Sequence, residues 1–450
     1  MKALFFLRHS DDIDYITPVI YKWAKSGHAC DVVLIGDVRL INDYRIQFLN
    51  RISDVRVAHI RDVLPRLEYL QWRMLHLLWV HGIQRIVSGY CAALLQQMTS
   101  EEKRMQVWKS IANRLLGRSF PDGTRGVVVF DWFSRSSPIS IEWVACIASA
   151  TRKMGLGAVS LFHGDSSHVN QLTRRQEWKL QPDSVYSLGR IFNQVIVPNE
   201  LCALRFRPFM HEQSVAVLGS PRLCDEWLEI MQTLLPATSS LGNPSSKLKI
   251  AIFLKKDDFA IFWEEVNEVI QMVAAFSGVE LIIKPMSHNH RKQNLHRELE
   301  LWHLSNVYVA EKAIQSTHLV NWADIVIDLA TPAAYEAVKM RKPVLAADYL
   351  HAGLSTLAEF IPETRLRCRD DVYRCIDKFL SQGFQSFYIR SHWQHFMREV
   401  VDGPDTDVLS RYVTLLEMEA QTRQVNVEQA DSNTNAVVWD SVDSTHTLVG

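Results

Sequence analysis

The chain has 450 residues, a length that exceeds one ordinary hydrophobic core and favours two domains. Hydrophobic residues make up 47% and charged residues 22% of it, proportions that are typical of a globular protein and exclude an intrinsically disordered one. The formal net charge is −1, so the chain as a whole carries no field that would recruit nucleic acid or anionic lipid.

The cysteines and the N-terminus favour a cytoplasmic protein. The seven cysteines are an odd number without C-x-x-C spacing, which argues against a zinc site and against a disulfide framework. The apolar run near the N-terminus is too short for a signal peptide. No apolar run approaches the roughly 20 residues of a membrane span, so any membrane association is expected to be peripheral.

The first half of the chain alternates between apolar strands and amphipathic helices. The strands are predicted at residues 3–7, 31–35, 126–131, 158–162 and 194–197. Helical stretches at residues 16–25, 65–79 and 139–154 are long enough to cross over between parallel strands. This alternation predicts an α/β domain with a parallel sheet.

The second half repeats the pattern after a break that is rich in Pro, Ser and Gly. Its strands are predicted at residues 248–254, 279–284, 307–310, 325–328 and 344–347. The predicted domains are an N-terminal Rossmann-like acceptor domain (1–220), a linker (221–247), a C-terminal Rossmann-like nucleotide-donor domain (248–384), helices packing back across the boundary (385–420) and a poorly ordered tail (421–450).

Acidic residues follow the first predicted strand directly. Asp11, Asp12 and Asp14 should lie at the carboxyl edge of the sheet, where α/β proteins bind ligands. A carboxylate or imidazole there could serve as a general base, and Asp12 is the preferred candidate because Asp11 is closer to the strand end. The alternative is that one of these acids caps the helix that begins near Tyr15. Asp131 occupies an equivalent edge position after a later strand.

The segment 324–344, DIVIDLATPAAYEAVKMRKPV, predicts a buried strand, a tight turn and a helix. Pro332 suits the first helical position and Thr331 the N-cap. Because a helix N-terminus after a parallel strand attracts anions, this turn is a candidate phosphate site. Glu336 lies just over one turn inside, where its carboxylate could accept hydrogen bonds from ribose; it could equally be a solvated helix residue.

Four motifs together resemble one group of proteins. Lys284-Pro285 ends an apolar strand upstream of the T-P-x-x-Y-E-A segment, His163-Gly164 follows another strand, and residues 217–222 read V-L-G-S-P-R. Their order is similar to that of bacterial surface-polysaccharide transferases of the GT-B fold. These include CDP-glycerol glycerophosphotransferases, capsule Kdo transferases and polysialyltransferases, with UDP-N-acetylglucosamine 2-epimerases as more distant relatives. The resemblance covers roughly residues 1–380.

This resemblance implies two Rossmann-type domains that face each other across a cleft, with no metal and no cofactor beyond the donor. It implies a nucleotide-sugar donor and a polysaccharide or lipid-linked acceptor. The near-zero net charge and the absence of an RNA-binding signature argue against a nucleic acid partner. His163 joins Asp11 and Asp12 as a catalytic candidate. The donor-binding candidates are Lys284, Thr331, Glu336, Ser220, Arg222 and Lys255, because hydroxyls, ammonium groups and the arginine fork suit phosphate.

One departure from the family keeps other functions open. These families usually read K-P-H-P, whereas this chain has Met286 at the histidine position, so His288 or His290 substitutes for it or the donor differs. The expected activity is transfer of a glycosyl or glycerophosphoryl unit from a nucleotide-activated donor to a surface polysaccharide. The alternatives are a nucleotide-sugar 2-epimerase-type isomerase and a catalytically silent GT-B paralogue.

Overall fold

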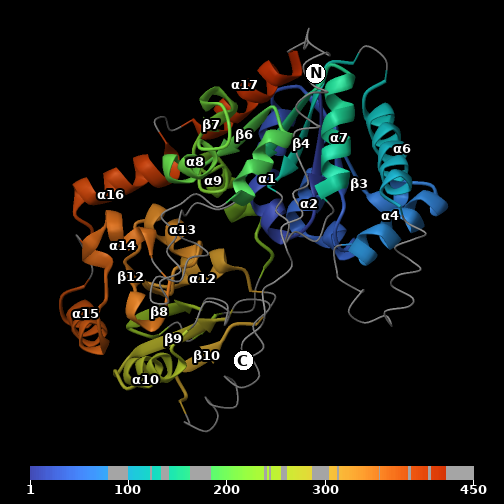
Figure 1. Cartoon of the computed structure of the whole chain (residues 1–450). Helices are drawn as coiled ribbons and strands as arrows, with labels where there is room; N and C mark the ends of the chain where they lie inside the picture. The colour runs from blue at the N-terminus through green and yellow to red at the C-terminus, as the bar shows by residue number, and fades with distance from the viewer. Residues whose placement is uncertain are drawn as a thin grey trace.

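The structure, a computed structural model, describes residues 1–79, 100–121, 124–132, 141–162, 184–237, 241–242, 245–254, 261–285, 304–311, 314–353, 355–383, 387–403 and 407–421. They form two α/β halves, each built on a parallel sheet with helices on both faces (Figure 1). The predicted fold class, two Rossmann-type parallel-sheet domains, is confirmed.

The N-terminal sheet has seven strands in the order β3-β2-β1-β4-β5-β6-β7, all paired in parallel. The strands are β1 (Lys2–Leu7), β2 (Ala29–Leu34), β3 (Val55–His59), β4 (Gly126–Asp131), β5 (Gly157–Leu161), β6 (Gln194–Val197) and β7 (Val215–Val217). The five strands predicted here are present, with bounds shifted by at most two residues.

The two edge strands, β3 and β7, were not predicted from the sequence. β3 is only partly buried and has the exposed Arg56 between its apolar residues, and β7 is an apolar run of only three residues, shorter than an ordinary strand. Helix α1 also starts earlier than predicted. Helix α1 begins at Ser10, and the carboxylates of Asp11 and Asp12 in its first turn are favoured by the positive end of the helix dipole.

Two layers of helices cover this sheet. One face carries α4 (Arg66–Trp79), α6 (Glu101–Ser119), α7 (Ile141–Lys153) and α8 (Glu200–Phe206), and the short α3 (Ile60–Val63) precedes α4. The other face carries α1 (Ser10–Lys25), α2 (Tyr44–Leu49), α9 (Asp225–Leu234) and α17 (Val408–Gln421). Large aromatic side chains, including Trp23, Trp108 and Trp143, are fully buried in these layers.

The C-terminal sheet has five strands in the order β10-β9-β8-β11-β12. They are β8 (Leu248–Phe253), β9 (Val279–Lys284), β10 (Val307–Val309), β11 (Ile325–Asp328) and β12 (Val344–Ala346), close to the predicted ranges. One face carries α10 (Trp263–Ala274) and α15 (Arg369–Gln382). The other carries α12 (Ser316–Trp322), α13 (Ala333–Lys339), α14 (Thr356–Phe360) and α16 (Arg390–Phe396).

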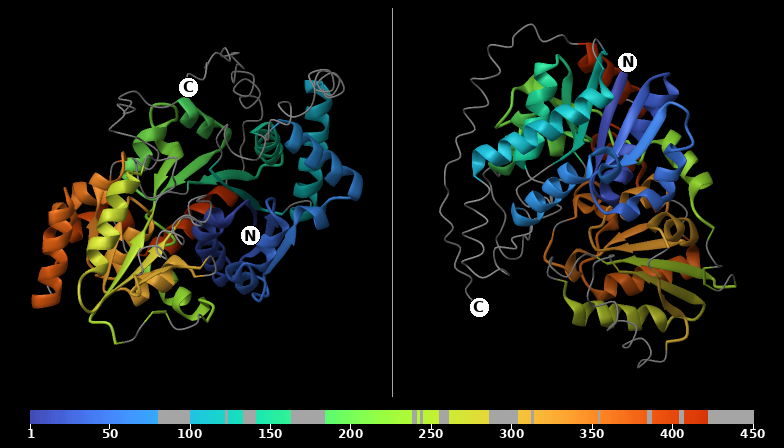
Figure 2. Two further views of the ribbon diagram at one scale, coloured as in Figure 1. Left: turned by 90° about the horizontal axis from the view of Figure 1, so that it is seen from below. Right: turned by 90° about the vertical axis from the view of Figure 1, so that its right-hand side faces the viewer.

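The chain passes between the two halves twice. Helix α9 occupies the first part of the segment 221–247 and packs on the N-terminal half through the buried Trp227. After α16 and the π-helical turn Met397–Asp402, α17 returns to the N-terminal half and packs on α1, β4 and β5 (Figures 1 and 2). The exact domain limits drawn from the sequence stay a prediction.

Gly219 lies where the returning segment meets the N-terminal half. Its φ is 89°, and a Cβ added there would lie 2.5 Å from the backbone oxygen of Asp402. The neighbouring Ser220 N–H donates to the carbonyl of Val401 at 2.7 Å, and the Tyr412 hydroxyl donates to the Gly219 carbonyl at 3.0 Å. The G-S-P-R motif therefore joins the two crossings of the chain.

Candidate functional site

The turn between β1 and α1 carries a cluster of charged side chains at the carboxyl edge of the N-terminal sheet. His9 is the N-cap residue of α1, with an extended backbone (φ −149°). Arg8 precedes it, and Asp11 and Asp12 follow in the first helical turn. The three acids that follow the first strand have different surroundings. Asp11 is exposed, Asp12 is fully buried, and Asp14 contacts Arg45 and Arg222.

Arg8 joins two buried carboxylates that are far apart in the sequence. Asp12 accepts from the Arg8 backbone N–H at 2.7 Å and from its Nε at 3.2 Å. Nη2 of Arg8 donates to Asp131 at the end of β4 and, at 2.8 Å, to the carbonyl of Trp132. Because Asp12 and Asp131 have no exposed surface, the guanidinium supplies the counter-charge that buried carboxylates require.

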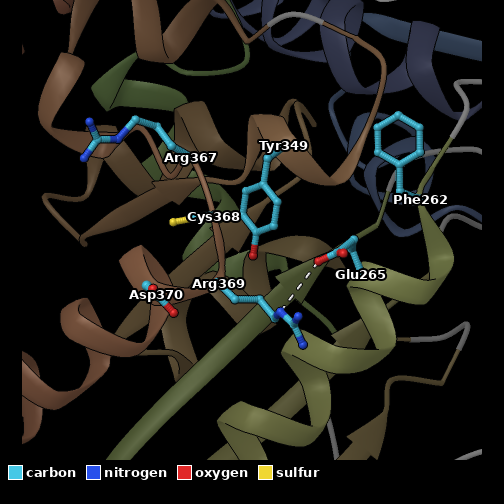
Figure 3. Close-up of a pocket in the computed structure, with 7 residues that line it drawn as sticks. All are labelled: Phe262, Glu265, Tyr349, Arg367, Cys368, Arg369 and Asp370. Carbon is cyan, nitrogen blue, oxygen red and sulfur yellow. Dashed lines mark ion pairs between the residues drawn. The ribbon is translucent and has the colours of Figure 1, made fainter.

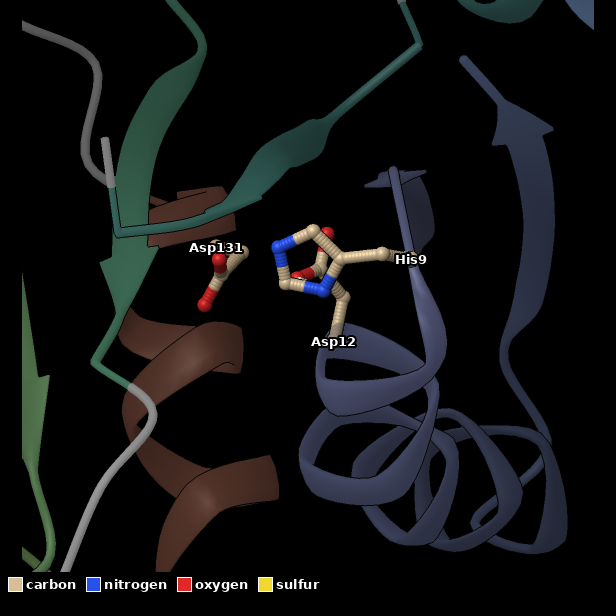
Figure 4. Close-up of side chains that lie close together, drawn as sticks. All are labelled: His9, Asp12 and Asp131. Atoms are coloured by element: carbon tan, nitrogen blue, oxygen red, sulfur yellow. Dashed lines mark ion pairs between the residues drawn. The ribbon is translucent and has the colours of Figure 1, made fainter. Parts of the chain in front are cut away.

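His9 lies against this cluster with its ring partly open to solvent. Its Nδ1 is 2.9 Å from Oδ1 of Asp12, and 38% of its side-chain surface is exposed. In Figure 4 the imidazole and the carboxylates of Asp12 and Asp131 point toward one another. Burial acts to lower the pKa of His9, but the adjacent Asp12 carboxylate raises it, and the net pKa lies above the ordinary value. An imidazole held by a buried carboxylate is an oriented general base.

His9 and Arg8 were not among the residues predicted from the sequence. The signal that would have found His9 was its position, directly after a buried strand and at the N-cap of the next helix. No local signal could have found the contact of Arg8 with Asp131, because 123 residues separate them.

His9, Asp12 and Asp131 have the residue types and spacing of a metal site, with ligand atoms within 4.8 Å of one another. The donor set fits a metal poorly, because Arg8 already places its guanidinium between the two carboxylates. A cation would have to displace that guanidinium and leave it buried without its partners, which is costly. The arrangement favours proton transfer over metal binding.

A second cluster joins the two halves of the protein. Arg222 places Nη1 2.9 Å from Oδ2 of Asp14 and Nη2 3.8 Å from Oε2 of Glu336. Asp14 also accepts from Nη1 of Arg45 at 2.7 Å. Asp14 lies near the start of α1, after β1, and Glu336 lies in α13, after β11. The carboxyl edges of the two sheets therefore meet at Arg222.

Glu336, predicted to contact the donor ribose, is almost fully buried. Burial raises the pKa of its carboxyl group, and the charge of Arg222 opposes that rise. Its Oε1 has no hydrogen-bond partner among the described residues. The charged carboxylate thus depends on Arg222 and on a hydrogen bond with the Thr317 side chain, and a ribose would reach it only after a local rearrangement of these contacts.

The turn between β11 and α13 differs from the predicted capping. The helix begins at Ala333, one residue later than expected, and Pro332 occupies the N-cap position with a helical φ of −63°. The Thr331 hydroxyl donates to the carboxylate of Asp328, and its N–H donates to the same group at 3.0 Å, so its side chain does not cap the helix. Ala330 has a φ of 56°, a strained conformation for a residue with a Cβ.

The remaining donor-site candidates are placed by contacts within the protein. Lys284, at the carboxyl end of β9, donates from Nζ to the carbonyls of Glu311 and Ile314. Ser220 is fully buried, and its hydroxyl has no partner among the described residues. The predicted roles of Lys284, Ser220, Arg222, Thr331 and Glu336 in donor binding stay predictions.

Several predicted residues lie outside the described part of the chain. They are His163, Lys255, Met286, His288 and His290. Their predicted roles, and the question of which side chain replaces the K-P-H-P histidine, are untested by the structure.

A pocket of 570 Å³ lies within the C-terminal half (Figure 3). It is lined by Phe262, Glu265, Tyr349, Arg367, Cys368, Arg369 and Asp370. None of the predicted site residues lines it. Its cationic side chains already have acidic partners, since Arg369 contacts Glu265 at 3.7 Å and Arg367 contacts Asp371 at 3.1 Å. The clusters at His9 and Arg222 hold buried carboxylates beside a partly exposed imidazole and a guanidinium, and so carry more acid–base chemistry than this pocket.

No family model and no curated protein matches this sequence. Solved structures with the same fold are numerous. A UDP-GlcNAc 2-epimerase from Neisseria meningitidis bound to UDP-GlcNAc has a TM-score of 0.55 at 11% identity, over 93% of this chain and 99% of that one. The epimerase from Rickettsia bellii has a TM-score of 0.53 at 11% identity, over 98% of this chain and 99% of that one. The glycotransferase of kitacinnamycin has a TM-score of 0.50 at 10% identity, over 93% of this chain and 98% of that one.

At these identities the likeness concerns the fold. Both domains are covered in each comparison, because the alignments span more than nine-tenths of the chain. The similar structures include epimerases and glycosyltransferases on one architecture. The chain therefore has the two-domain GT-B fold.

Proposed function

We propose that this protein transfers a glycosyl unit from a nucleotide-activated donor to a hydroxyl group of a surface polysaccharide or its lipid-linked precursor. The observation that carries the proposal is the contact between His9 and the buried Asp12 at the carboxyl edge of the N-terminal sheet. The similar structures include a glycotransferase and epimerases that act on UDP-GlcNAc, which supports a nucleotide-sugar donor.

In this reaction His9 is the general base. Nε2 accepts the proton of the acceptor hydroxyl as that oxygen attacks the anomeric carbon of the donor. Asp12 holds Nδ1 and stabilises the imidazolium that forms. Asp12 was predicted from the sequence to be the base. In this mechanism it is a positioning residue, because its carboxylate is buried and already contacts Arg8.

The bond between the anomeric carbon and the phosphate breaks as the new bond forms, and the electron pair leaves with the nucleoside diphosphate. Lys284 and the turn at Thr331 lie at the carboxyl ends of β9 and β11 and would neutralise that charge. If the donor carries a glycerophosphoryl unit, the same base activates the acceptor for attack at phosphorus, and the nucleoside monophosphate leaves.

The second candidate is a 2-epimerase-type isomerase, which the number of epimerases among the similar structures favours. The third is a silent paralogue, favoured by Met286 at the position of the family histidine. Incubation of the full chain with UDP-GlcNAc in D₂O separates the isomerase from the others, because only an isomerase exchanges the proton at the inverted carbon without an acceptor.

A thermal-shift screen against UDP, CDP, CMP and GDP tests the donor site. A ligand at 100 times its dissociation constant stabilises the folded protein by about 2.7 kcal/mol. Stabilisation by at least one nucleotide is expected, and release of that nucleotide from its sugar donor in the presence of polysaccharide acceptor should follow. Stabilisation by none of the four would favour the silent paralogue.

A further inference from the structure

Helix α4 has two apolar faces, and only one of them is buried in the protein. Trp72 and Leu75 enter the core on one side. On the opposite side Leu67, Leu70 and Met74 expose 69%, 60% and 45% of their surface. A surface helix of a soluble protein ordinarily turns polar side chains outward. We call Leu67, Leu70 and Met74 the outer stripe.

The outer stripe is flanked by positive charge. At about 100° per residue, Leu67, Leu70 and Met74 fall within roughly 60° of the helix circumference, and Arg66 and Arg73 lie together along one border of them. Both arginines are exposed, and neither makes an ion pair within the described part of the chain. The acid of this helix, Glu68, lies on the other border and is held by Arg114 at 2.6 Å. The exposed arc thus combines apolar side chains with cationic ones that no described acidic residue pairs with.

We infer that the outer stripe of α4 is a docking surface for a membrane that contains anionic lipid. Apolar side chains insert at the boundary between headgroups and acyl chains, and arginines beside them pair with lipid phosphates. A protein partner of the same shape would need an acidic face around an apolar centre, which is a more demanding match. None of the described helices has the length and hydropathy to cross a bilayer.

The position of α4 suits an enzyme that acts on a membrane-bound acceptor. The helix begins shortly after β3, beside α6, and β3 is separated from β1 only by β2 (Figures 1 and 2). Strands lie about 4.8 Å apart, so the ends of β1 and β3 are about 10 Å apart. His9 follows β1 at the same edge of the sheet. The link between the position of α4 and a membrane-bound acceptor rests on the proposed function, whereas the docking of α4 on a membrane does not.

Vesicle flotation with the full chain tests the inference. The parent should float with vesicles of phosphatidylcholine and phosphatidylglycerol in equal parts. Its partitioning to vesicles of phosphatidylcholine alone should be at least about tenfold weaker, because two arginines near an anionic surface contribute about 1 kcal/mol each. The triple variant Leu67→Gln, Leu70→Gln, Met74→Gln should lose about 100-fold in partitioning to the anionic vesicles. The double variant Arg66→Gln, Arg73→Gln should bind the anionic vesicles no better than the neutral ones.

Leu204→Gln is the matched control, because Leu204 is an exposed leucine of α8 and shows 56% of its surface. It should bind vesicles as the parent does. If the triple variant fails to fold, Leu70→Ser alone provides the same test at smaller amplitude. Absence of vesicle binding by the parent, or equal binding by parent and triple variant, would overturn the inference. A change from dimer to monomer in the triple variant, with no vesicle binding by the parent, would instead assign the stripe to a contact between copies.

Vesicle binding is measured without substrate, so its outcome is independent of whether the protein catalyses the transferase reaction. An active transferase that does not bind vesicles would leave the proposed function in place and reject this surface.

Discussion

The Nδ1 atom of His9 lies 2.9 Å from the Oδ1 atom of Asp12, and this contact joins a partly exposed imidazole to a carboxylate that has no exposed surface. Orientation and basicity of the imidazole both follow from it. The buried partner fixes the ring, and its charge raises the pKa of His9 above the ordinary value.

The pH dependence of kcat/KM identifies the base. If His9 takes the acceptor proton, the rate should rise with pH through an apparent pKa above 6.5, because the base must be unprotonated. Asp12→Asn removes the charge that raises the pKa, so the acidic limb should move to lower pH. His9→Asn should lower turnover by about two to four powers of ten at unchanged donor affinity. An acidic limb that does not move when His9 is replaced by Asn would show that another group is the base.

The predicted donor site makes a separate prediction. Glu336→Ala should weaken binding of the preferred nucleotide by about 1.5–3 kcal/mol, through loss of charge-assisted hydrogen bonds to ribose. Lys284→Ala should weaken a nucleoside diphosphate more than the nucleoside. Titration calorimetry measures both, with Glu264→Ala, an exposed glutamate of α10, as the control. Parent-like affinity in both test variants would remove these residues from the site.

Loss of Arg222 should destabilise the folded protein. Arg222→Met leaves the buried carboxylate of Glu336 without its cation, a change that costs about 3–5 kcal/mol. The pKa of Glu336 is already raised by burial and should rise further, so the variant should lose more stability relative to the parent as the pH is raised from about 4 toward neutrality. The double variant Arg222→Met, Glu336→Gln should recover part of the loss in urea unfolding. Equal stability of parent and single variant between these pH values would show that Arg222 does not support Glu336.

Gly219→Ala should destabilise more than Gly383→Ala. Both glycines have a positive φ, of 89° and 70°, so both substitutions carry backbone strain of about 1–2 kcal/mol. Only at Gly219 would the new Cβ also meet a backbone atom, the carbonyl oxygen of Asp402, whereas nothing lies within 4 Å at Gly383. The difference should appear as a lower Tm for Gly219→Ala, and equal Tm values would contradict the close approach.

A chelator should leave turnover unchanged. Arg8 already lies between Asp12 and Asp131, so a metal ion is not required to balance these carboxylates. The check is nucleotide release before and after treatment with EDTA. Loss of activity that Mg²⁺ or Mn²⁺ restores would assign the His9, Asp12 and Asp131 cluster to a metal ion.

The architecture could be predicted from the sequence because buried parallel strands carry an unmistakable signal. Strands such as β4 and β11 carry continuous apolar runs, and their predicted bounds agree with the structure to the residue. The short edge strands β3 and β7 could not be predicted in this way. β3 carries the exposed Arg56 in its middle and β7 has only three residues, so pairing with β2 and β6, rather than a long apolar run, defines them.

The site was less predictable because its contacts are long-range. Position relative to the strands drew attention to the β1–α1 turn, but the choice between Asp12 and His9 depends on which side chain is buried. Asp12 is buried against Arg8, which also binds Asp131, and these residues meet only in the folded protein. Likewise, nothing near Glu336 in the sequence indicated that Arg222 would reach it from the other half.

The return of α17 to the N-terminal half sets the order in which the protein can mature on the ribosome. Val408, Leu409, Tyr412 and Leu416 fill one core of the N-terminal half, although β7, the last strand of that half, ends at Val217. About 200 residues must be synthesised in between, which takes roughly 10–40 seconds at ~5–20 residues per second. Throughout that interval the nascent N-terminal half exposes an apolar surface that its own sheet and helices do not cover. Translation arrested before residue 408 should therefore yield a chain that binds chaperones, and completion of α17 should release it.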